Sequence, residues 1–112
     1  MGRRGEKLAA EYLKGKGYKI LKRNLRTPFG EADIVAQEGD TVVFCEVKAR
    51  LSDSFGTPAE AVERRKRRRY ADIARWFLMR AGQEVPVRFD VLEVGEEGVR
   101  HIPAAFDGEG RA

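Results

Sequence analysis

The amino-acid sequence predicts a single α/β domain in which helices flank a mixed β-sheet, with elements in the order α-β-β-β-α-β-β. Three observations support this fold class. The chain has 112 residues, a size at which one hydrophobic core suffices. Hydrophobic residues make up 42% and charged residues 36%, so there is enough apolar material for a core and too much for a disordered chain. Segments with helical spacing also alternate with runs of strand-forming residues.

The first half of the chain predicts one helix and three strands. A helix is expected over residues 2–14, where apolar side chains recur at helical spacing and a glycine-rich stop follows. Residues 18–26 alternate apolar and polar side chains, which favours a partly exposed strand. Two β-branched runs at 32–37 and 41–48 flank Glu38-Gly39-Asp40 and predict a β-hairpin.

The second helix has a clearly marked start. Thr57-Pro58-Ala59-Glu60 combines an N-cap threonine, a proline at the first helical position and a glutamate that completes a capping box. The helix is expected to run to Ala81 and to end at Gly82. Residues 87–94 and 99–102 then predict two further strands around a glycine-containing turn.

Composition also bounds the compartment and the domain limits. Cys45 is the only cysteine, which excludes an internal disulfide and a cysteine zinc cluster and favours the cytoplasm. The N-terminus lacks the apolar centre of a signal peptide, and no run of about 18 apolar residues predicts a membrane span. We expect a domain over residues 1–106 and a flexible C-terminal tail over 107–112, which is rich in glycine and charge.

The third predicted strand carries an unusual pair of charges. Residues 42–48 are apolar apart from Glu46 and Lys48. Side chains alternate between the two faces of a strand, so Glu46 and Lys48 point to one face and Val47 to the other. Asp33 lies among apolar residues in the adjoining strand of the hairpin, which can bring it beside Glu46. The sequence therefore predicts two carboxylates and an ammonium group on one surface.

Two neighbouring carboxylates favour a bound proton or cation, and hard oxygen ligands of this kind suit Mg²⁺ or Mn²⁺. Asp33 and Glu46, with the Val47 carbonyl as a further candidate, would hold the ion and leave positions for water and a phosphate oxygen. Lys48 would orient or help to deprotonate the water, or stabilise charge in the transition state. The alternative is structural: Glu46 and Lys48 form an ordinary surface ion pair, and Asp33 caps a turn.

A run of cations follows in the second helix. The net charge is only +4, but residues 64–69 read R-R-K-R-R-R, a pattern that indicates a polyanion partner or, alternatively, a solvated helix face. Lys66 interrupts the apolar stripe of this helix, so it is expected either to reach the polar pocket or to extend its amine to solvent. The candidate nucleic-acid contacts are Arg64, Arg65, Arg67, Arg68 and Arg69.

Four further residues are weaker candidates. Glu6 lies at the margin of the apolar stripe of the first helix and either supports the site or is a surface glutamate stabilised by the helix dipole. Glu31, two residues before Asp33, either adds a metal or water contact or is a solvated residue. His101 is the only histidine, and we expect a structural or surface role for it. Cys45 is expected to face away from Glu46 as a small core residue.

These motifs also resemble known families. Asp33, followed after twelve residues by Glu46-Val47-Lys48, resembles the motif of the PD-(D/E)XK nuclease superfamily, whose core has the order α-β-β-β-α-β. A longer set of segments resembles the YraN family of small bacterial proteins, which is related by fold to archaeal Holliday-junction resolvases. The segments are Gly5-Glu6, Gly17-Tyr18, Phe29 to Ile34, Val43 to Arg50, Phe55 to Val62, Lys66, Arg69 and Val87 to Val91.

The resemblance implies a restriction-endonuclease-like fold and a residue-by-residue assignment. Asp33 and Glu46 match the metal-binding acids and Lys48 the motif lysine. Glu6 matches the glutamate of the first helix, and Lys66 matches the polar residue of the helix after the motif. Two positions depart from the pattern, because alanine 32 stands where proline is common and alanine 49 offers no hydroxyl. Neither change removes a metal ligand.

The leading hypothesis is a Mg²⁺- or Mn²⁺-dependent endonuclease-like protein that acts on DNA, including branched or flapped structures. Dimerisation would let two sites address two strands, so a homodimer is an open alternative to a monomer. No membrane partner is expected. A rival hypothesis is a non-catalytic nucleic-acid-binding protein on a nuclease scaffold. A third is an interaction protein whose basic helix binds an acidic protein partner.

Overall fold

The computed structural model describes residues 3–49 and 60–112 and has the predicted order of elements. The elements are α1 (Arg3–Gly15), β1 (Lys19–Thr27), β2 (Gly30–Glu38), β3 (Thr41–Ala49), α2 (Glu60–Ala81), β4 (Val87–Gly95) and β5 (Gly98–Phe106). The predicted N-cap and proline at positions 57 and 58 lie outside the described residues. Within those residues, neither helix combines the length and the apolar character needed to cross a bilayer.

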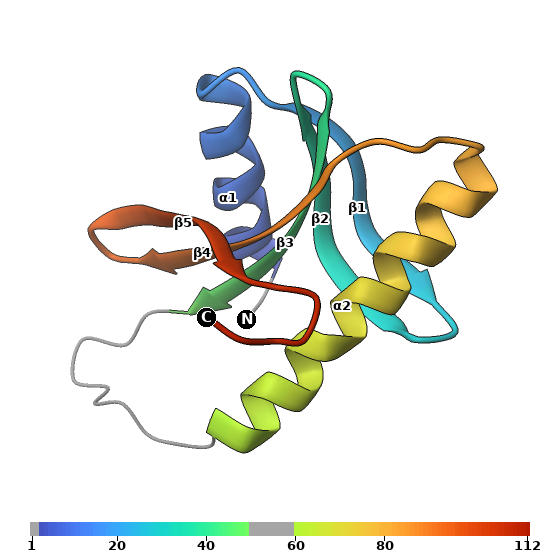
Figure 1. Cartoon of the computed structure of the whole chain (residues 1–112). Helices are drawn as coiled ribbons and strands as arrows, with labels where there is room; N and C mark the ends of the chain where they lie inside the picture. The colour runs from blue at the N-terminus through green and yellow to red at the C-terminus, as the bar shows by residue number, and fades with distance from the viewer. Residues whose placement is uncertain (1–2, 50–59) are drawn as a thin grey trace.

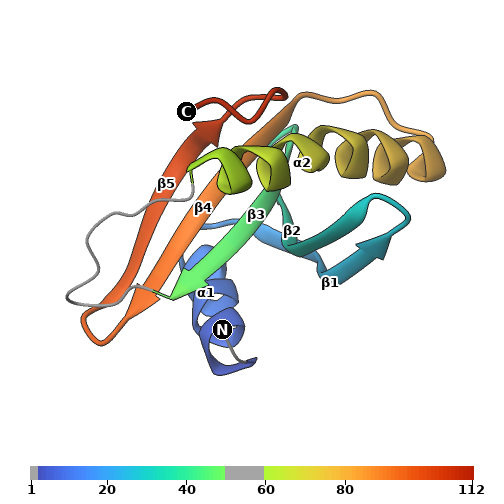
Figure 2. The same ribbon diagram turned by 90° about the horizontal axis from the view of Figure 1, so that it is seen from below.

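The five strands form one sheet in the order β1-β2-β3-β4-β5, with α1 on one face and α2 on the other (Figures 1 and 2). Neighbouring strands are antiparallel except for β3 and β4, which are parallel. A parallel pair needs a crossover, and α2 supplies it. The mixed α/β fold class predicted from the sequence is therefore confirmed.

Each face of the sheet contributes to its own core. One cluster joins β3 side chains such as Val43 and Cys45 to α1, and the other joins Val42 and Phe44 to α2. Residues 42–47 are consequently all buried, as expected for a strand that is covered on both faces. Glu46 has the parity of Val42 and Phe44, so it lies on the α2 face, and Cys45 faces away from it as predicted.

In strand β2 the alternation of side chains between the two faces of the sheet is interrupted at Asp33. Ala32 packs in the α2 core, but Ile34 packs in the α1 core, although both positions are even. The intervening Asp33 lies opposite Asn24 of β1, whose φ of 55° is in the left-handed region that asparagine tolerates. Pairing between β2 and β3 ends at Ile34, so the two strands separate beside Asp33.

Strand β5 extends beyond the predicted residues 99–102 to Phe106. Pro103, the residue after the predicted end, has no N–H group to donate to the ladder. The pairing register shifts instead, and Ala104 adopts a φ of 51°. Its N–H donates to the Asp90 carboxylate at 3.0 Å, so a side chain replaces the missing backbone acceptor at this bulge.

The last six residues, here called the C-terminal hook (107–112), turn back toward α2 (Figure 2). The Asp107 carboxylate accepts hydrogen bonds from the backbone N–H groups of Glu109 at 2.8 Å and Arg111 at 2.9 Å. Gly110 is buried with a φ of 80°, and a Cβ there would approach the Arg64 carbonyl oxygen to 2.5 Å. The hook therefore packs against α2 at Gly110. The flexibility predicted for residues 107–112 stays a prediction.

Candidate functional site

The carboxylate of Glu46 is buried on the α2 face of the sheet. Its side chain is 1% exposed, and within residues 3–49 and 60–112 neither of its oxygens has a hydrogen-bond partner. Two ammonium groups lie near Oε2, Lys48 Nζ at 3.6 Å and Lys66 Nζ at 3.9 Å. These distances allow charge attraction but exceed the usual hydrogen-bond length. Burying a carboxylate without direct hydrogen bonds is unfavourable, so this arrangement is suited to a further cationic partner.

Asp33 occupies the gap where β2 and β3 separate. Its Oδ2 accepts a hydrogen bond of 2.7 Å from the backbone N–H of Val47, so the side chain takes the place of a neighbouring strand. Burial raises the pKa of Asp33, and the negative charges of Glu6 and Glu46 raise it further, against the opposing effects of the Val47 N–H and Lys66. The two predicted acids therefore lie close enough to repel each other.

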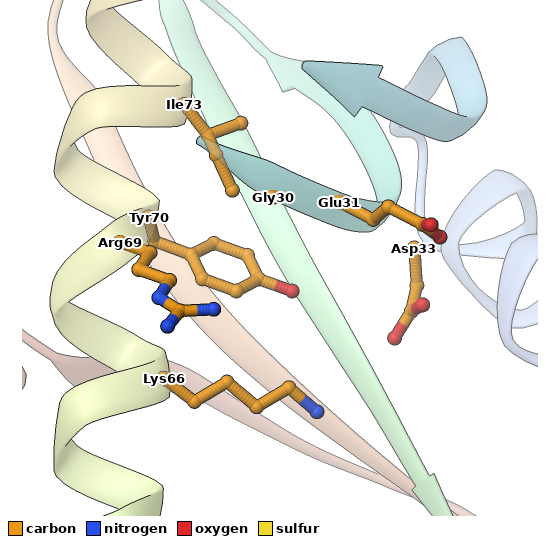
Figure 3. Close-up of a pocket in the computed structure, with 7 residues that line it drawn as sticks. All are labelled: Gly30, Glu31, Asp33, Lys66, Arg69, Tyr70 and Ile73. Carbon is orange, nitrogen blue, oxygen red and sulfur yellow. The ribbon is translucent and has the colours of Figure 1, made fainter. Parts of the chain in front are cut away.

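A pocket of about 260 Å³ lies between β2 and α2 next to these acids. Figure 3 shows side chains of β2 on one side of it and side chains of α2 on the other. Its lining residues are Gly30, Glu31, Asp33, Lys66, Arg69, Tyr70 and Ile73. Acidic oxygens and cationic nitrogens thus face each other across a space large enough for a phosphate group.

Tyr70 belongs to this site, although its spacing along α2 is that of the apolar stripe. Its side chain is buried, and its hydroxyl points toward Asp33 in Figure 3. Burial raises the pKa of Tyr70, as do the nearby charges of Glu46 and Asp33, and a hydrogen bond with the Asp33 backbone acts in the opposite direction. The phenol therefore stays protonated. Its position one turn after Lys66 was the signal that could have identified it.

The supporting acids take different positions. Glu6 of α1 is half-buried and acts electrostatically on Asp33. Glu31 lines the pocket but is exposed, and its Oε2 lies 3.9 Å from Arg26 Nε. The Lys66 side chain is 61% exposed, yet its ammonium group reaches Glu46 across the pocket. It therefore combines the two predicted positions, contact with the polar pocket and exposure to solvent.

The arginines of the basic run at residues 64–69 point in different directions. Arg69 lines the pocket, whereas Arg65 and Arg68 are exposed on the outer side of α2. Arg67 is half-buried and stacks on the Phe106 ring, with 5.3 Å between the guanidinium carbon and the ring centroid. Arg64 Nε donates to the Glu109 carbonyl of the hook at 3.4 Å. The five candidate arginines therefore have different surroundings and do not form one uniform surface.

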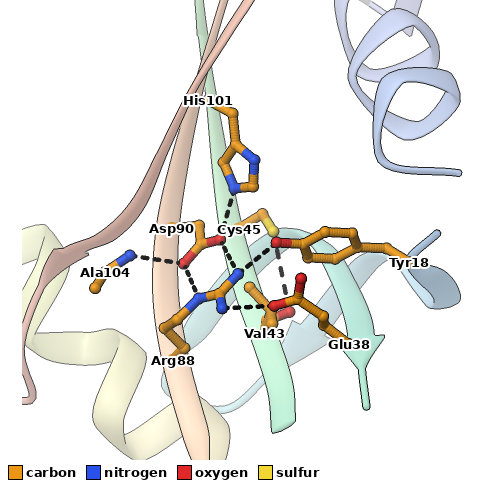
Figure 4. Close-up of polar contacts among 8 residues, drawn as sticks. All are labelled: Tyr18, Glu38, Val43, Cys45, Arg88, Asp90, His101 and Ala104. Atoms are coloured by element: carbon orange, nitrogen blue, oxygen red, sulfur yellow. Dashed lines mark hydrogen bonds and ion pairs between the residues drawn. The ribbon is translucent and has the colours of Figure 1, made fainter. Parts of the chain in front are cut away.

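A second buried acid lies on the opposite face of the sheet (Figure 4). Asp90 is fully buried and accepts two hydrogen bonds from Arg88, at 2.9 and 2.8 Å. His101 Nε2 lies 2.7 Å from its Oδ2. Arg88 also contacts Tyr18 at 2.6 Å and Glu38 at 2.8 Å. Sequence reasoning did not single out this network, and the signal that could have revealed it is the acid inside the apolar run 87–94.

The Asp90 network has its partners in place. Burial opposes ionisation, yet hydrogen bonds from His101, Arg88 and the Ala104 N–H hold the pKa of Asp90 below its ordinary value. His101 is 7% exposed and packs edge-on against Tyr12 and Tyr18, with 5.7 Å between ring centroids in both pairs. The network therefore joins β4 and β5 to the region of α1.

Within residues 3–49 and 60–112, no three His, Cys, Asp or Glu side chains gather closely enough to bind a metal without other ligands. Any ion at the pocket would therefore depend on the two acids together with backbone, water or substrate oxygens. Together, the fold and the pocket define the chain as a small single-domain α/β protein with an acid-and-lysine site between its sheet and its crossover helix.

Residues 5–94 match the model of the uncharacterised protein family UPF0102, and the chain belongs to that family. A UPF0102 protein of Thermodesulfovibrio yellowstonii is 47% identical over 106 residues, which cover 95% of each chain. One from Anaeromyxobacter dehalogenans is 47% identical over 116 aligned positions, covering 99% of this chain and 87% of the relative. One from Symbiobacterium thermophilum is 50% identical over 95 residues, covering 84% and 80%.

Proposed function

We propose that this protein is a metal-dependent nucleic-acid phosphodiesterase of the endonuclease type, acting on DNA, including branched structures. The observation that carries the proposal is the buried Glu46 carboxylate, which has no hydrogen-bond partner among the described residues and lies beside a second acid of raised pKa, Asp33. Such a pair is unfavourable by itself and becomes favourable with a divalent cation.

The residues present fit Mg²⁺ or Mn²⁺. Glu46 offers two oxygens without hydrogen-bond partners, and Asp33 is fixed by the Val47 N–H, so its direction is set before any ion arrives. Hard carboxylate ligands are the ones that these ions prefer, and both ions accept water and phosphate oxygens in the remaining positions. When bound, such an ion supplies Lewis-acid polarisation of the phosphate and lowers the pKa of bound water.

The neighbouring side chains have complementary roles in hydrolysis. Lys48 lies on the same face as Glu46 with a 27% exposed side chain, so its ammonium can hold the attacking water or the negative charge that develops on phosphorus-bound oxygens. Lys66 and Arg69 line the pocket and would bind the non-bridging phosphate oxygens. Water adds to phosphorus, the bond to one ester oxygen breaks, and that oxygen leaves with a proton.

Two further facts support nucleic acid as the substrate class. The cations of α2 continue beyond the pocket, and basic side chains of this kind make sequence-independent contacts with phosphates. The sequence also resembles the YraN family and the PD-(D/E)XK nucleases at Asp33, Glu46 and Lys48. Fold resemblance alone does not establish a reaction, so the assignment depends on the site.

The test compares the wild-type chain with Asp33→Asn, which keeps an acceptor for the Val47 N–H, and with Asp40→Asn, an exposed control in the β2–β3 turn. Mn²⁺ binding is measured by calorimetry, and cleavage of labelled duplex, single-stranded and four-way DNA is followed with Mg²⁺ or Mn²⁺. We expect binding and cleavage in the wild type and the control and loss of both in Asp33→Asn. Equal behaviour of all three chains would contradict catalysis at this site.

A second candidate function is favoured by the two lysines beside Glu46. Because Lys48 and Lys66 both lie within 4 Å of its carboxylate, they already compensate its charge without a metal. On this basis the protein would be a non-catalytic nucleic-acid-binding module that keeps a nuclease scaffold. DNA binding that is independent of divalent ions, together with no cleavage of any of the DNA forms, would identify this alternative.

A further inference from the structure

A second hollow lies on the outer side of α2, away from the acids. It has a volume of about 650 Å³ and is bounded by the helix on one side and by the C-terminal hook on the other. We call it the outer groove. Its lining residues are Arg65, Arg68, Arg69, Ala71, Asp72, Arg75, Gly108 and Glu109.

The outer groove has an excess of positive charge. Four arginines line it against two acids, Asp72 and Glu109. Asp72 is paired with Arg75 at 3.1 Å, and Glu109 lies 3.8 Å from Arg111 of the hook. Within the described part of the chain, no ion pair joins Arg65, Arg68 or Arg69 to an acid. Like charges three and four residues apart on a helix repel each other by a few tenths of a kcal/mol per pair, and a polyanion would remove that repulsion.

The hook gives the outer groove a fixed second wall. Gly110 packs against the backbone and side chain of Arg64. Its positive φ is a backbone conformation that residues with a side chain rarely adopt. Asp107 organises the turn by accepting backbone hydrogen bonds, which also lower its pKa. The outer groove therefore has α2 on one side and the hook on the other, and a ligand in it can contact both.

The outer groove and the pocket share one lining residue. Arg69 lines both hollows, and a Cβ placed on Gly30 of β2 would lie 3.9 Å from the Arg69 Cδ on the pocket side. A chain with regularly spaced phosphates could therefore place one phosphate at the acids and the following ones along Arg65 and Arg68.

The size of the outer groove selects among forms of nucleic acid. It is an open groove of about 650 Å³ along four arginines of one helix, a footprint that suits a short stretch of one strand. A double helix would instead lie across the rims. Among the described residues, no aromatic side chain lines the groove, so binding there would follow the charged backbone without stacking on bases.

We propose that the outer groove binds single-stranded nucleic acid through its phosphates and guides the strand over Arg69 toward the acidic pocket. This inference rests on the proposed function, since it names the form of nucleic acid that the site would receive. It requires no cleavage, however, and so it can be tested without a metal ion.

The experiment measures fluorescence anisotropy of a short labelled oligothymidylate with the full chain in EDTA, at several salt concentrations. Arg65→Ala and Arg68→Ala remove outer-groove cations that do not line the pocket. Each should weaken binding by roughly threefold to tenfold and reduce the slope of log K against log salt by about 0.7. Arg23→Ala, an exposed arginine of β1, is the matched control and should leave both quantities unchanged.

A charge change of the opposite sign sharpens the test. Glu109→Gln removes an acid from the outer groove and should strengthen binding by about twofold to threefold, whereas Glu97→Gln in the exposed β4–β5 turn should not. Blunt duplex DNA should bind more weakly than the single strand and respond less to the groove variants. An oligouridylate arm separates RNA from DNA preference within the same proposal.

Two results would overturn the inference. One is a loss of affinity in Arg65→Ala and Arg68→Ala no larger than in Arg23→Ala. The other is equal sensitivity of single strand and duplex to the groove variants, which would indicate general attraction to a basic surface. Because EDTA removes the metal ion, a failure here leaves the cleavage test of Asp33→Asn standing, and a failure of cleavage leaves this binding test standing.

Discussion

The sheet carries a buried acid on each face, and the two acids differ in how their charge is satisfied. Asp90, on the α1 face, receives hydrogen bonds from Arg88 and the Ala104 N–H and contacts His101 at 2.7 Å. Glu46, on the α2 face, is equally buried but has no hydrogen-bond partner in the part of the chain that the structure describes. A satisfied buried acid holds strands together, whereas an unsatisfied one keeps its oxygens available for a ligand.

The difference follows from the local chain. Asp90 lies opposite the β5 bulge, where Ala104 supplies a backbone donor. Arg88, two positions before Asp90 in β4, lies on the same face and donates to its carboxylate. Glu46 lies where β2 has separated from β3, and its nearest cations are long, flexible lysines. A fold of this size can therefore maintain one strongly bonded buried acid and one loosely compensated buried acid.

Removal of the satisfied acid should have the largest effect on stability. Asp90→Ala leaves Arg88 and the Ala104 N–H without their partner in a buried region, so the free energy of unfolding should fall by about 3–5 kcal/mol. Urea denaturation followed by circular dichroism measures it. Asp40→Ala, at an exposed turn, is the control and should change stability by less than about 0.5 kcal/mol. A loss below about 1 kcal/mol in Asp90→Ala would show that the network is not structural.

The unsatisfied acid should respond in the opposite sense. Glu46→Gln removes a buried charge, and its partners Lys48 and Lys66 are partly exposed and can turn to water. Stability should be unchanged or higher by up to about 1 kcal/mol, while Mn²⁺ affinity measured by calorimetry falls at least about tenfold. Strong destabilisation with intact Mn²⁺ binding would reverse the roles assigned to the two acids.

A smaller effect is expected at Tyr70. Tyr70→Phe removes a hydroxyl whose pKa the Asp33 backbone lowers by hydrogen bonding but keeps the ring in the α2 core. Unfolding free energy should fall by about 0.5–1.5 kcal/mol, the usual net value of one hydrogen bond. The thermal unfolding curve gives this change. Phe77→Leu, elsewhere in the same core, separates loss of packing from loss of the hydroxyl.

The smallest effect concerns acid stability, where the two faces have opposite signs. Asp90 has a lowered pKa, so its contribution is present above the ordinary value of 3.8 and is lost as pH falls through its folded pKa. Asp33 has a raised pKa, so it favours folding when protonated and loses that contribution as pH rises through its folded pKa.

In urea titrations from neutral to acidic pH, Asp90→Asn should therefore flatten the loss of stability relative to the wild type, and Asp33→Asn should steepen it. Asp40→Asn again serves as the exposed control. If both site variants flatten the profile, then Asp33 is held as an ordinary stabilised carboxylate and the proposed repulsion at the pocket is absent.

Sequence reasoning reached the element order and the face of each β3 side chain because both depend on local periodicity. It placed Asp33 near Glu46 through the hairpin, although the interruption of alternation in β2 came only with the structure. It missed the role of Tyr70, whose hydroxyl is indistinguishable from core packing without the position of Asp33. It also ended β5 early, since the bulge at Ala104 depends on Asp90, fourteen residues away.

The hydrogen bond between the Val47 N–H and the Asp33 carboxylate has a practical consequence. This amide donates its hydrogen bond to a titratable side chain and not to the backbone of another strand. Its chemical shift should therefore change when that side chain is protonated or binds a ligand. In a nitrogen–proton correlation spectrum, the Val47 resonance would then serve as an internal probe of the pocket. It would allow each stage of metal and nucleic-acid binding to be followed in the intact protein without any label placed in the site.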